Sequence, residues 1–281
     1  MKIFRGFEAA SGIKNPVVTT GSFDGVHIGH KTIINRLKML AAKYDGESVL
    51  ITFDPHPRKV LYPEAAGRDL RLIYSQEEKL IKLEEAGLDN VIIVNFTLDF
   101  SKITSEQFVR DFLYSRLKVK VIVVGFNHHF GFNREGDYRQ LWDWRDKYRF
   151  EAEEIPEQEV QHETVSSTKI RKAIREGHIQ RANAYLDHYY MIMGKFAPYI
   201  RRELPGMPSF RKILISEECK LLPAAGIYAV SASISHENVV KGMGVVLEDE
   251  GNGSEVLFYP FEIFNNSFDK ISMFFHKKIY G

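Results

Sequence analysis

The sequence predicts an α/β domain followed by a smaller all-β domain, and two observations lead to this prediction. From residue 16 to about residue 187, short apolar runs alternate with segments of helical periodicity. From residue 188 onward, β-rich runs follow one another across Gly, Asn, Asp and Pro turns, with no clear helical segment between them. Alternation of strand and helix is typical of βαβ units in a doubly wound parallel sheet, so the first domain is expected to be Rossmann-like.

Four apolar runs are the expected strands of the first domain. Their apolar residues are continuous rather than alternating, which is typical of parallel strands that are buried on both faces of the sheet. These runs are residues 16–21, 48–53, 91–96 and 120–125.

The helices between these strands carry recognisable start and stop signals. Ser75 and Glu78 have the spacing of a capping box, and that helix is expected to end at Gly87. Thr104 and Gln107 repeat the capping-box spacing in front of the next helical segment. We therefore place the first domain at residues 1–187 and predict that residues 188–281 form a small antiparallel β-barrel.

Composition limits the class of protein. The 38 Lys and Arg residues nearly balance the 37 Asp and Glu residues, and the net charge of +1 predicts neither a nucleic-acid nor an anionic-membrane partner. The single cysteine, Cys219, excludes an internal disulfide and a multi-cysteine metal cluster. The sequence also shows neither a signal peptide nor a long apolar span, so we expect a cytoplasmic protein. Its oligomeric state is left open.

The stretch TTGSFDGVHIGH, residues 19–30, lies where the first strand meets the first helix. Its glycines allow a sharp turn and a close approach of the backbone to a ligand. His27 and His30 are three residues apart at the start of a helix, a position that attracts phosphate. A zinc site is a weaker interpretation because no third ligand follows at a typical spacing, and neither a P-loop nor a dinucleotide fingerprint is present.

A second candidate phosphate site is the stretch SSTKIR, residues 166–171. A helix is expected to begin near Ser167, so that hydroxyl groups and free backbone N–H groups meet in its first turn. Arg171 follows one turn later and suits a polyphosphate.

Four segments together resemble the bacterial FAD synthetases, a family of bifunctional riboflavin kinases and FMN adenylyltransferases. His27 to His30 are similar to the HxGH signature of nucleotidyltransferases, and the longer GSFDGVHIGH is similar to the opening motif of this family. The other segments follow in the family's order: TFDPHP (52–57), GFNHHFGFNREGD (125–137) and SSTKIR (166–171).

The resemblance implies an enzyme that transfers AMP from ATP to FMN and releases pyrophosphate, with Mg²⁺ accompanying ATP and FAD as the product. It implies that His27, His30 and Arg171 act in catalysis and that Asp24 and Asn127 line the flavin site. It assigns ATP binding to a larger set of residues, which comprises Gly21, Ser22, Phe23, Gly29, Ser167 and Thr168.

The second domain departs from the family pattern. The GFPTAN stretch of the kinase half is replaced by RRELPGMPSFRKILI, in which Pro208 aligns but Ser209 and Phe210 replace the neighbouring residues. Glu255 stands at the position of the catalytic glutamate, whereas FNNSFD replaces the DLYG element that normally follows. We therefore expect a barrel that is inactive as a kinase.

Three alternatives stay open. They are a fully bifunctional enzyme, another HxGH nucleotidyltransferase that acts on a pantetheine or nicotinate nucleotide, and a flavin-binding protein without catalysis. A class I aminoacyl-tRNA synthetase is disfavoured because there is no KMSKS segment and no appended basic domain.

Overall fold

The structure of the chain is a computed structural model. It describes residues 1–65, 67–126, 128–156, 159–160, 163–202, 210–235, 238–249, 253–261 and 270–281. The chain forms two compact units, Met1–Leu70 with Leu80–Thr164 and Arg71–Lys79 with Val165–Gly281. The segment Arg71–Lys79 thus belongs to the same unit as the C-terminal barrel. The expected division into functional domains at residue 187 stays a prediction.

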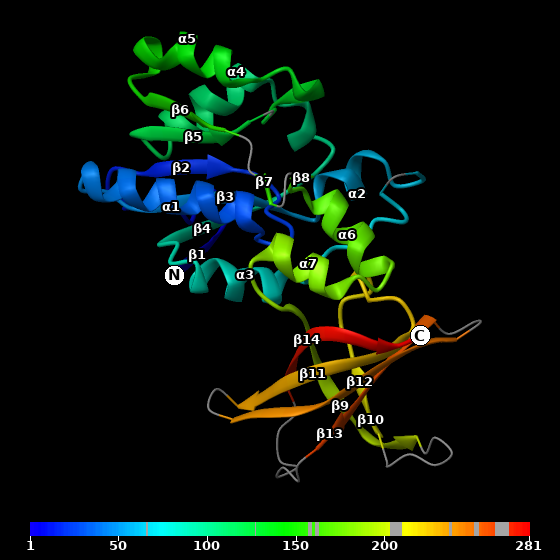
Figure 1. Ribbon diagram of the computed structural model, residues 1–281. Helices are drawn as coiled ribbons and strands as arrows, with labels where there is room; N and C mark the ends of the chain where they lie inside the picture. Colours follow the sequence, from blue (N-terminus) through cyan, green and yellow to red (C-terminus); the bar gives the residue numbers. More distant parts are fainter. Residues whose placement is uncertain are drawn as a thin grey trace. The chain divides into compact units, whose positions relative to one another are not determined.

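The first unit contains a six-stranded sheet in which every neighbouring pair of strands is parallel, in the order β1-β4-β3-β2-β5-β6 (Figure 1). This confirms the predicted fold class and the four predicted strands. The strands are β1 (Lys2–Arg5), β2 (Val17–Thr20), β3 (Ser48–Asp54), β4 (Asn90–Asn95), β5 (Val121–Gly125) and β6 (Glu151–Ile155). The two edge strands β1 and β6 were not predicted, because their sequences KIFR and EAEEI are short and largely polar.

Helices cover both faces of this sheet. Alternate strand residues enter two hydrophobic clusters, one shared with α1 (Ile28–Lys43) and α3 (Gln76–Glu85), the other with η2 (Phe108–Tyr114) and α5 (Tyr138–Tyr148). Both predicted capping boxes are present, at Ser75 with Glu78 and at Thr104 with Gln107. After α4 (Ser105–Gln107) the chain continues as η2, a π-helix, whereas the sequence predicted an ordinary helix.

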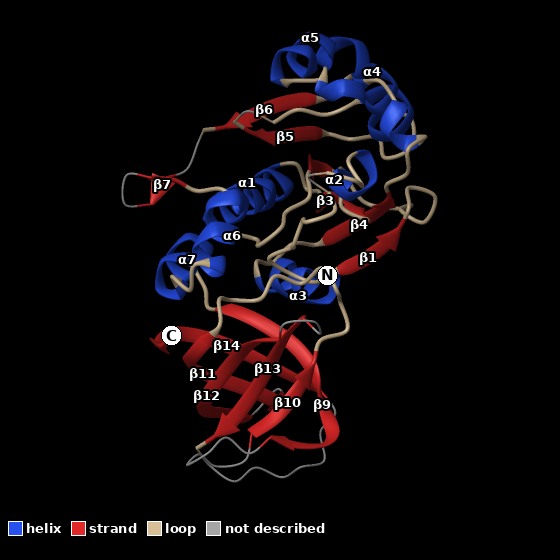
Figure 2. Ribbon diagram, turned by 90° about the vertical axis from the view of Figure 1, so that its right-hand side faces the viewer, coloured by secondary structure: helices blue, strands red, loops and turns tan. Residues whose placement is uncertain are grey.

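The second unit contains helices α6 (Ser167–Arg175) and α7 (Ile179–Leu186) and a closed six-stranded barrel (Figure 2). The barrel order is β10-β13-β12-β11-β14-β9 and all its pairs are antiparallel, as predicted. Large side chains that are fully buried fill the barrel, among them Tyr228, Phe258 and Phe275, whereas Phe210 is buried in a separate cluster with Val245 and Leu257. The strands are β9 (Tyr190–Arg202), β10 (Phe210–Leu214), β11 (Gly226–Ser235), β12 (Asn238–Asp249), β13 (Gly253–Pro260) and β14 (Lys270–Tyr280).

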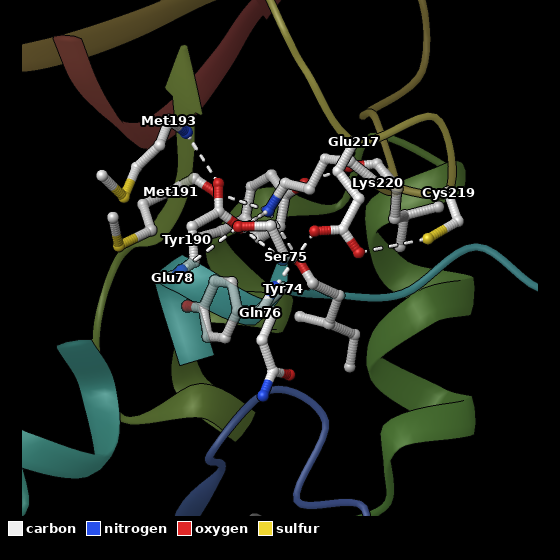
Figure 3. A network of polar contacts seen from close by, with 12 residues as sticks. Tyr74, Ser75, Gln76, Glu78, Tyr190, Met191, Met193, Glu217, Cys219 and Lys220 are labelled. Carbon is white, nitrogen blue, oxygen red and sulfur yellow. Dashed lines mark hydrogen bonds and ion pairs between the residues drawn. The ribbon is translucent and has the colours of Figure 1, made fainter. Parts of the chain in front are cut away.

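A buried ion pair anchors the segment Arg71–Lys79 within the second unit (Figure 3). Nζ of Lys220 lies 2.6 Å from Oε2 of Glu78, and both side chains are 1% exposed. The ammonium group also donates to the carbonyl oxygens of Ile73, at 2.6 Å, and Met191, at 2.7 Å. The second carboxylate oxygen of Glu78 accepts from the backbone N–H of Met193 at 2.7 Å. Each charge therefore has hydrogen-bond partners that replace the water it has lost.

Among the residues that the structure describes, no helix is both long and apolar enough to cross a membrane.

Candidate active site

The first candidate site lies at the carboxyl ends of β2, β3 and β5, three neighbouring parallel strands. From β2 the chain proceeds to β3 and β4 on one side, whereas β5 and β6 lie on the other side. The strand order therefore reverses beside β2. In doubly wound sheets the ligand binds in the crevice at this point of reversal. The loops that follow β2, β3 and β5 contain three of the four segments singled out in the sequence.

The loop after β2 is held in an unusual backbone conformation. Phe23 has φ +48°, Gly25 φ +93° and Val26 φ +42°. A β-branched residue such as Val26 rarely adopts positive φ, and such strain costs on the order of 1–3 kcal/mol. Phe23 and Val26 are buried in the core on one face of the sheet, and this burial keeps the loop in place.

Two further backbone contacts tie this loop to β3. The N–H of Gly21 donates to the carbonyl oxygen of Ile51 at 3.0 Å, and the hydroxyl of Thr52 donates to the carbonyl oxygen of Ser22 at 3.3 Å. Asp24, the predicted flavin residue, is 4% exposed. The loop is therefore rigid in its backbone at the position where the sequence predicts contact with the nucleotide.

The two histidines of the motif lie against one another at the start of α1. Their ring centroids are 3.7 Å apart with the planes inclined by 18°, and the ring of Phe23 stacks on His30 at 4.3 Å. His27 is the N-cap residue of α1, but its side chain makes no cap hydrogen bond, and the first turn of the helix contains no acidic residue. The arrangement brings two imidazole rings and the N-terminus of a helix together, as the spacing predicted, and this combination suits a phosphate group.

The loop after β3 begins with the TFDPHP segment. Nδ1 of His56 accepts from the backbone N–H of Arg58 at 3.2 Å, at the start of the short helix α2 (Pro57–Leu61). A neutral imidazole that accepts at Nδ1 carries its proton on Nε2. This histidine therefore presents a hydrogen-bond donor beside the carboxyl end of β3.

The loop after β5 contains an aromatic pair next to the predicted flavin residue Asn127, which lies outside the described residues. The ring centroids of His128 and Phe130 are 6.1 Å apart and their planes are inclined by 20°. The ring centroid of Phe130 also lies 6.1 Å from that of Phe108 in η2. Burial, together with the positive charges of His129 and Arg134, lowers the pKa of His128 to about 4. His128 is therefore neutral at physiological pH.

This pKa shift predicts a pH dependence of stability. The folded-state pKa of His128 lies below its ordinary value of 6.5, so the unfolded chain binds the proton first as the pH falls. The resulting stabilisation is complete above about pH 6.5 and is lost as the pH falls towards about 4. Between about pH 7 and about pH 4.5, the wild-type chain is expected to lose roughly 2 kcal/mol more free energy of unfolding than H128F. Urea unfolding at the two pH values measures this difference, and equal losses would contradict it.

The SSTKIR segment lies in the second unit and begins α6, as predicted. The N-cap residue is Ser166, whose hydroxyl accepts from the backbone N–H of Lys169 at 3.4 Å. Ser167 and Thr168 therefore occupy the first turn, where backbone N–H groups have no helical partner. Arg171 is 8% exposed although it is charged.

Glu255, the candidate residue of the barrel, forms an ion pair. Its Oε1 lies 2.7 Å from Nζ of Lys212 on the neighbouring strand β10, and the two side chains are 20% and 26% exposed. The carboxylate of Glu255 thus has a cationic partner within the barrel. Pro208, Ser209 and the FNNSFD stretch (264–269) lie outside the described residues.

A zinc centre finds no support in the described part of the chain, where no group of three or more His, Cys, Asp or Glu residues could hold a metal ion. Two polar residues in the loop after β5, His128 and Glu135, are not among the site residues predicted from the sequence. The repeated histidine directly after a buried strand was a usable signal for His128, whereas the contact of Glu135 depends on a residue 30 positions away.

Comparisons with known proteins agree with these motifs. The sequence profile of the FAD synthetase family matches residues 10–169. A bifunctional riboflavin kinase/FMN adenylyltransferase of Listeria monocytogenes is 31% identical over 268 residues, covering 95% of this chain and 81% of that protein. A protein of the same organism named FAD synthetase is 32% identical over 234 residues, covering 83% of this chain and 88% of that protein. The bifunctional enzyme of Escherichia coli K12 is 30% identical, covering 82% and 72%.

A solved structure has the same fold. The crystal structure titled macrolide-efflux protein from Streptococcus pneumoniae superimposes with a TM-score of 0.88 at 22% identity, covering 100% of this chain and 91% of that chain. At this identity the likeness extends to the fold alone. The profile match and the relatives, by contrast, identify the ancestry of the sequence: the chain belongs to the FAD synthetase family.

Proposed function

We propose that the chain catalyses the transfer of AMP from ATP to FMN, with release of pyrophosphate and formation of FAD. The observation that carries this proposal is the stacked His27–His30 pair at the start of α1, within a loop whose sequence has the opening motif of the family. An imidazole pair at a helix N-terminus is suited to phosphate oxygens. Names of relatives that include FMN adenylyltransferase support the choice of FMN as the acceptor.

The proposed chemistry asks for little covalent participation by the protein. The terminal phosphate of FMN is already an anionic nucleophile, so the enzyme has to bring two anions together in line and stabilise the negative charge on the α-phosphate and on the departing pyrophosphate. We assign the phosphate contacts to His27 and His30. Arg171, with Ser167 and Thr168 in the first turn of α6, is proposed to hold the triphosphate. Asp24 and Asn127 are proposed to line the flavin site.

The remaining ATP-binding residues are proposed from the same loop. Gly21, Ser22 and Phe23 precede the histidine pair in the sequence and Gly29 lies between the two histidines. The ring of Phe23 stacks on that of His30. Mg²⁺ is proposed to enter with ATP. Since the described residues offer no cluster of three ligands, its coordination would consist mainly of phosphate oxygens and water, which is the usual preference of this ion.

Riboflavin phosphorylation is the second candidate activity. It is favoured by the barrel itself and by the bifunctional relative that covers 95% of this chain. The Lys212–Glu255 ion pair and the missing Thr-Ala-Asn element argue against it. We therefore propose that the barrel is inactive as a kinase. We further propose that the chain works in the cytoplasm on small-molecule substrates, without a nucleic-acid or membrane partner.

Incubation of the full chain with Mg-ATP and either FMN or riboflavin, followed by chromatographic separation of the flavins, tests these assignments. We expect FAD from FMN and no FMN or FAD from riboflavin. Formation of FMN or FAD from riboflavin would restore the kinase activity. A chain that binds FMN but forms no FAD would be a flavin-binding protein, and turnover of a pantetheine or nicotinate nucleotide instead would place it among the other HxGH nucleotidyltransferases.

A further inference from the structure

The loop that follows β5 closes on itself. The backbone N–H of Phe130 donates to the carbonyl oxygen of Gly136 at 3.0 Å, and the N–H of Gly136 donates back to Phe130 at 2.9 Å. Between them, Asn133 and Arg134 have φ +51° and +60°, in the left-handed region that non-glycine residues rarely adopt. Residues 128–137, referred to below as the β5 loop, therefore have a defined but strained conformation, and contacts outside the loop have to maintain it.

One carboxylate ties the β5 loop to the start of α4. Oε1 of Glu135 accepts from the backbone N–H of Ser105 at 2.9 Å and lies 3.3 Å from its hydroxyl. The same hydroxyl donates to Oε1 of Gln140 at 3.0 Å, and the backbone N–H of Gln140 donates to Asp137, the N-cap residue of α5. Ser105 is 3% exposed whereas Glu135 is an exposed residue, so these bonds are shielded from water on the side of Ser105 only. Hydrogen bonds to an ionised acceptor are about twice as strong as those between neutral groups.

Two glycines allow the β5 loop to lie directly on Ser105. A Cβ at Gly131 would come within 2.5 Å of the backbone nitrogen of Ser105, and a Cβ at Gly136 within 2.7 Å of its Cβ. The backbone N–H of Phe132 also donates to Ile103 at 2.8 Å, just before α4. The loop and the helix start are therefore in close contact, and Glu135 supplies the charged group in that contact.

We propose that Glu135 is a positioning residue, which holds the β5 loop in the conformation that receives the flavin substrate. This inference rests on the proposed function, because Asn127, which is proposed to line the flavin site, immediately precedes the loop in the sequence. The loop also presents the ring pair His128 and Phe130 at the end of β5. Without the carboxylate, the left-handed residues are expected to relax and the ring pair to move away from the carboxyl edge of the sheet.

The test compares E135A and E135Q in steady-state kinetics of FAD formation by the full chain. Loss of the carboxylate in E135A is expected to raise KM for FMN about tenfold, with KM for ATP changed less than about twofold. The amide of E135Q can still accept from Ser105 and should restore KM for FMN to within about threefold of wild type. E106A is the matched control, because Glu106 is a glutamate on α4, next to Ser105. Its side chain pairs with Lys147 and Tyr148 and makes no contact with the loop among the bonds described.

A second variant approaches the same contact by steric means. G131A is expected to push the β5 loop away from Ser105 and to raise KM for FMN selectively, as E135A does. Thermal unfolding of each variant is measured alongside. A lower Tm without a selective change in KM for FMN would show that Glu135 has only a structural role and would overturn the inference. If the wild-type chain forms FAD, such a result leaves the proposed function intact; a wild-type chain that forms none overturns both.

Discussion

Replacing His30 by alanine is expected to lower the turnover number for FAD formation about a hundredfold or more, because loss of one preorganised donor to a developing negative charge typically costs roughly 3–4 kcal/mol. The structure gives a physical basis for preorganisation. The ring of His30 lies between the rings of Phe23 and His27, at centroid distances of 4.3 and 3.7 Å. Its orientation is therefore set before substrate binds. The measurement is kcat at saturating ATP and FMN.

The matched control for His30 is H178A. His178 is the N-cap residue of α7, its side chain is 60% exposed, and its Nδ1 lies 3.4 Å from Glu176. H178A makes the same change from histidine to alanine, but at a residue that is not a predicted substrate contact. Its kcat should therefore stay within about twofold of wild type. If H30A retained a rate within about threefold of wild type while folding normally, His30 would have no catalytic role and the assignment of the phosphate site would be wrong.

Replacing Lys220 by methionine is expected to lower the free energy of unfolding by about 3–5 kcal/mol, because the substitution leaves the carboxylate of Glu78 buried without its counter-charge. The ammonium group of Lys220 also lies over the rings of Tyr74 and Tyr190, at 4.8 and 4.6 Å from their centroids. Methionine keeps most of the length of the side chain, so the loss reports the charge more than the volume. Urea denaturation followed by circular dichroism measures the change.

Two further variants separate charge from position in this network. K220M with E78Q removes the unpaired charge, and the amide can still accept from Met193, so this double variant should recover at least half of the loss. K270M removes the partner of Glu77, the neighbour of Glu78, in an exposed pair, and should cost less than about 1 kcal/mol. Equal losses in K220M and K270M would mean that burial of the Lys220 pair does not matter.

The fold was largely predictable because its signals are local. The four central strands are continuous apolar runs, and the two capping boxes depend on residues three positions apart. The strands that were missed follow the same rule. β1 and β6 lie at sheet edges and carry polar residues. Edge strands bury less apolar surface, so their sequences carry a weaker pattern.

The candidate site was predictable in its residues but not in its contacts. The spacing of His27 and His30 predicted that they share one side of a helix, and their rings are in fact stacked. The stacking of Phe23 on His30 depends on positive φ at Phe23, a conformation that the residue type disfavours.

By itself, the sequence determined the class of fold, the order of the motifs and the residue types available for phosphate and flavin, because each depends on neighbours within a turn or a strand. Only the tertiary structure decided which distant residues meet. In the sequence Glu78 is an ordinary capping-box residue, yet its carboxylate forms an ion pair with Lys220, which is 142 positions later in the chain. Glu135 is an ordinary charged residue in the sequence, yet its carboxylate accepts from the backbone N–H of the buried Ser105. Such contacts are set by the neighbours that strand order creates, and no local pattern encodes them.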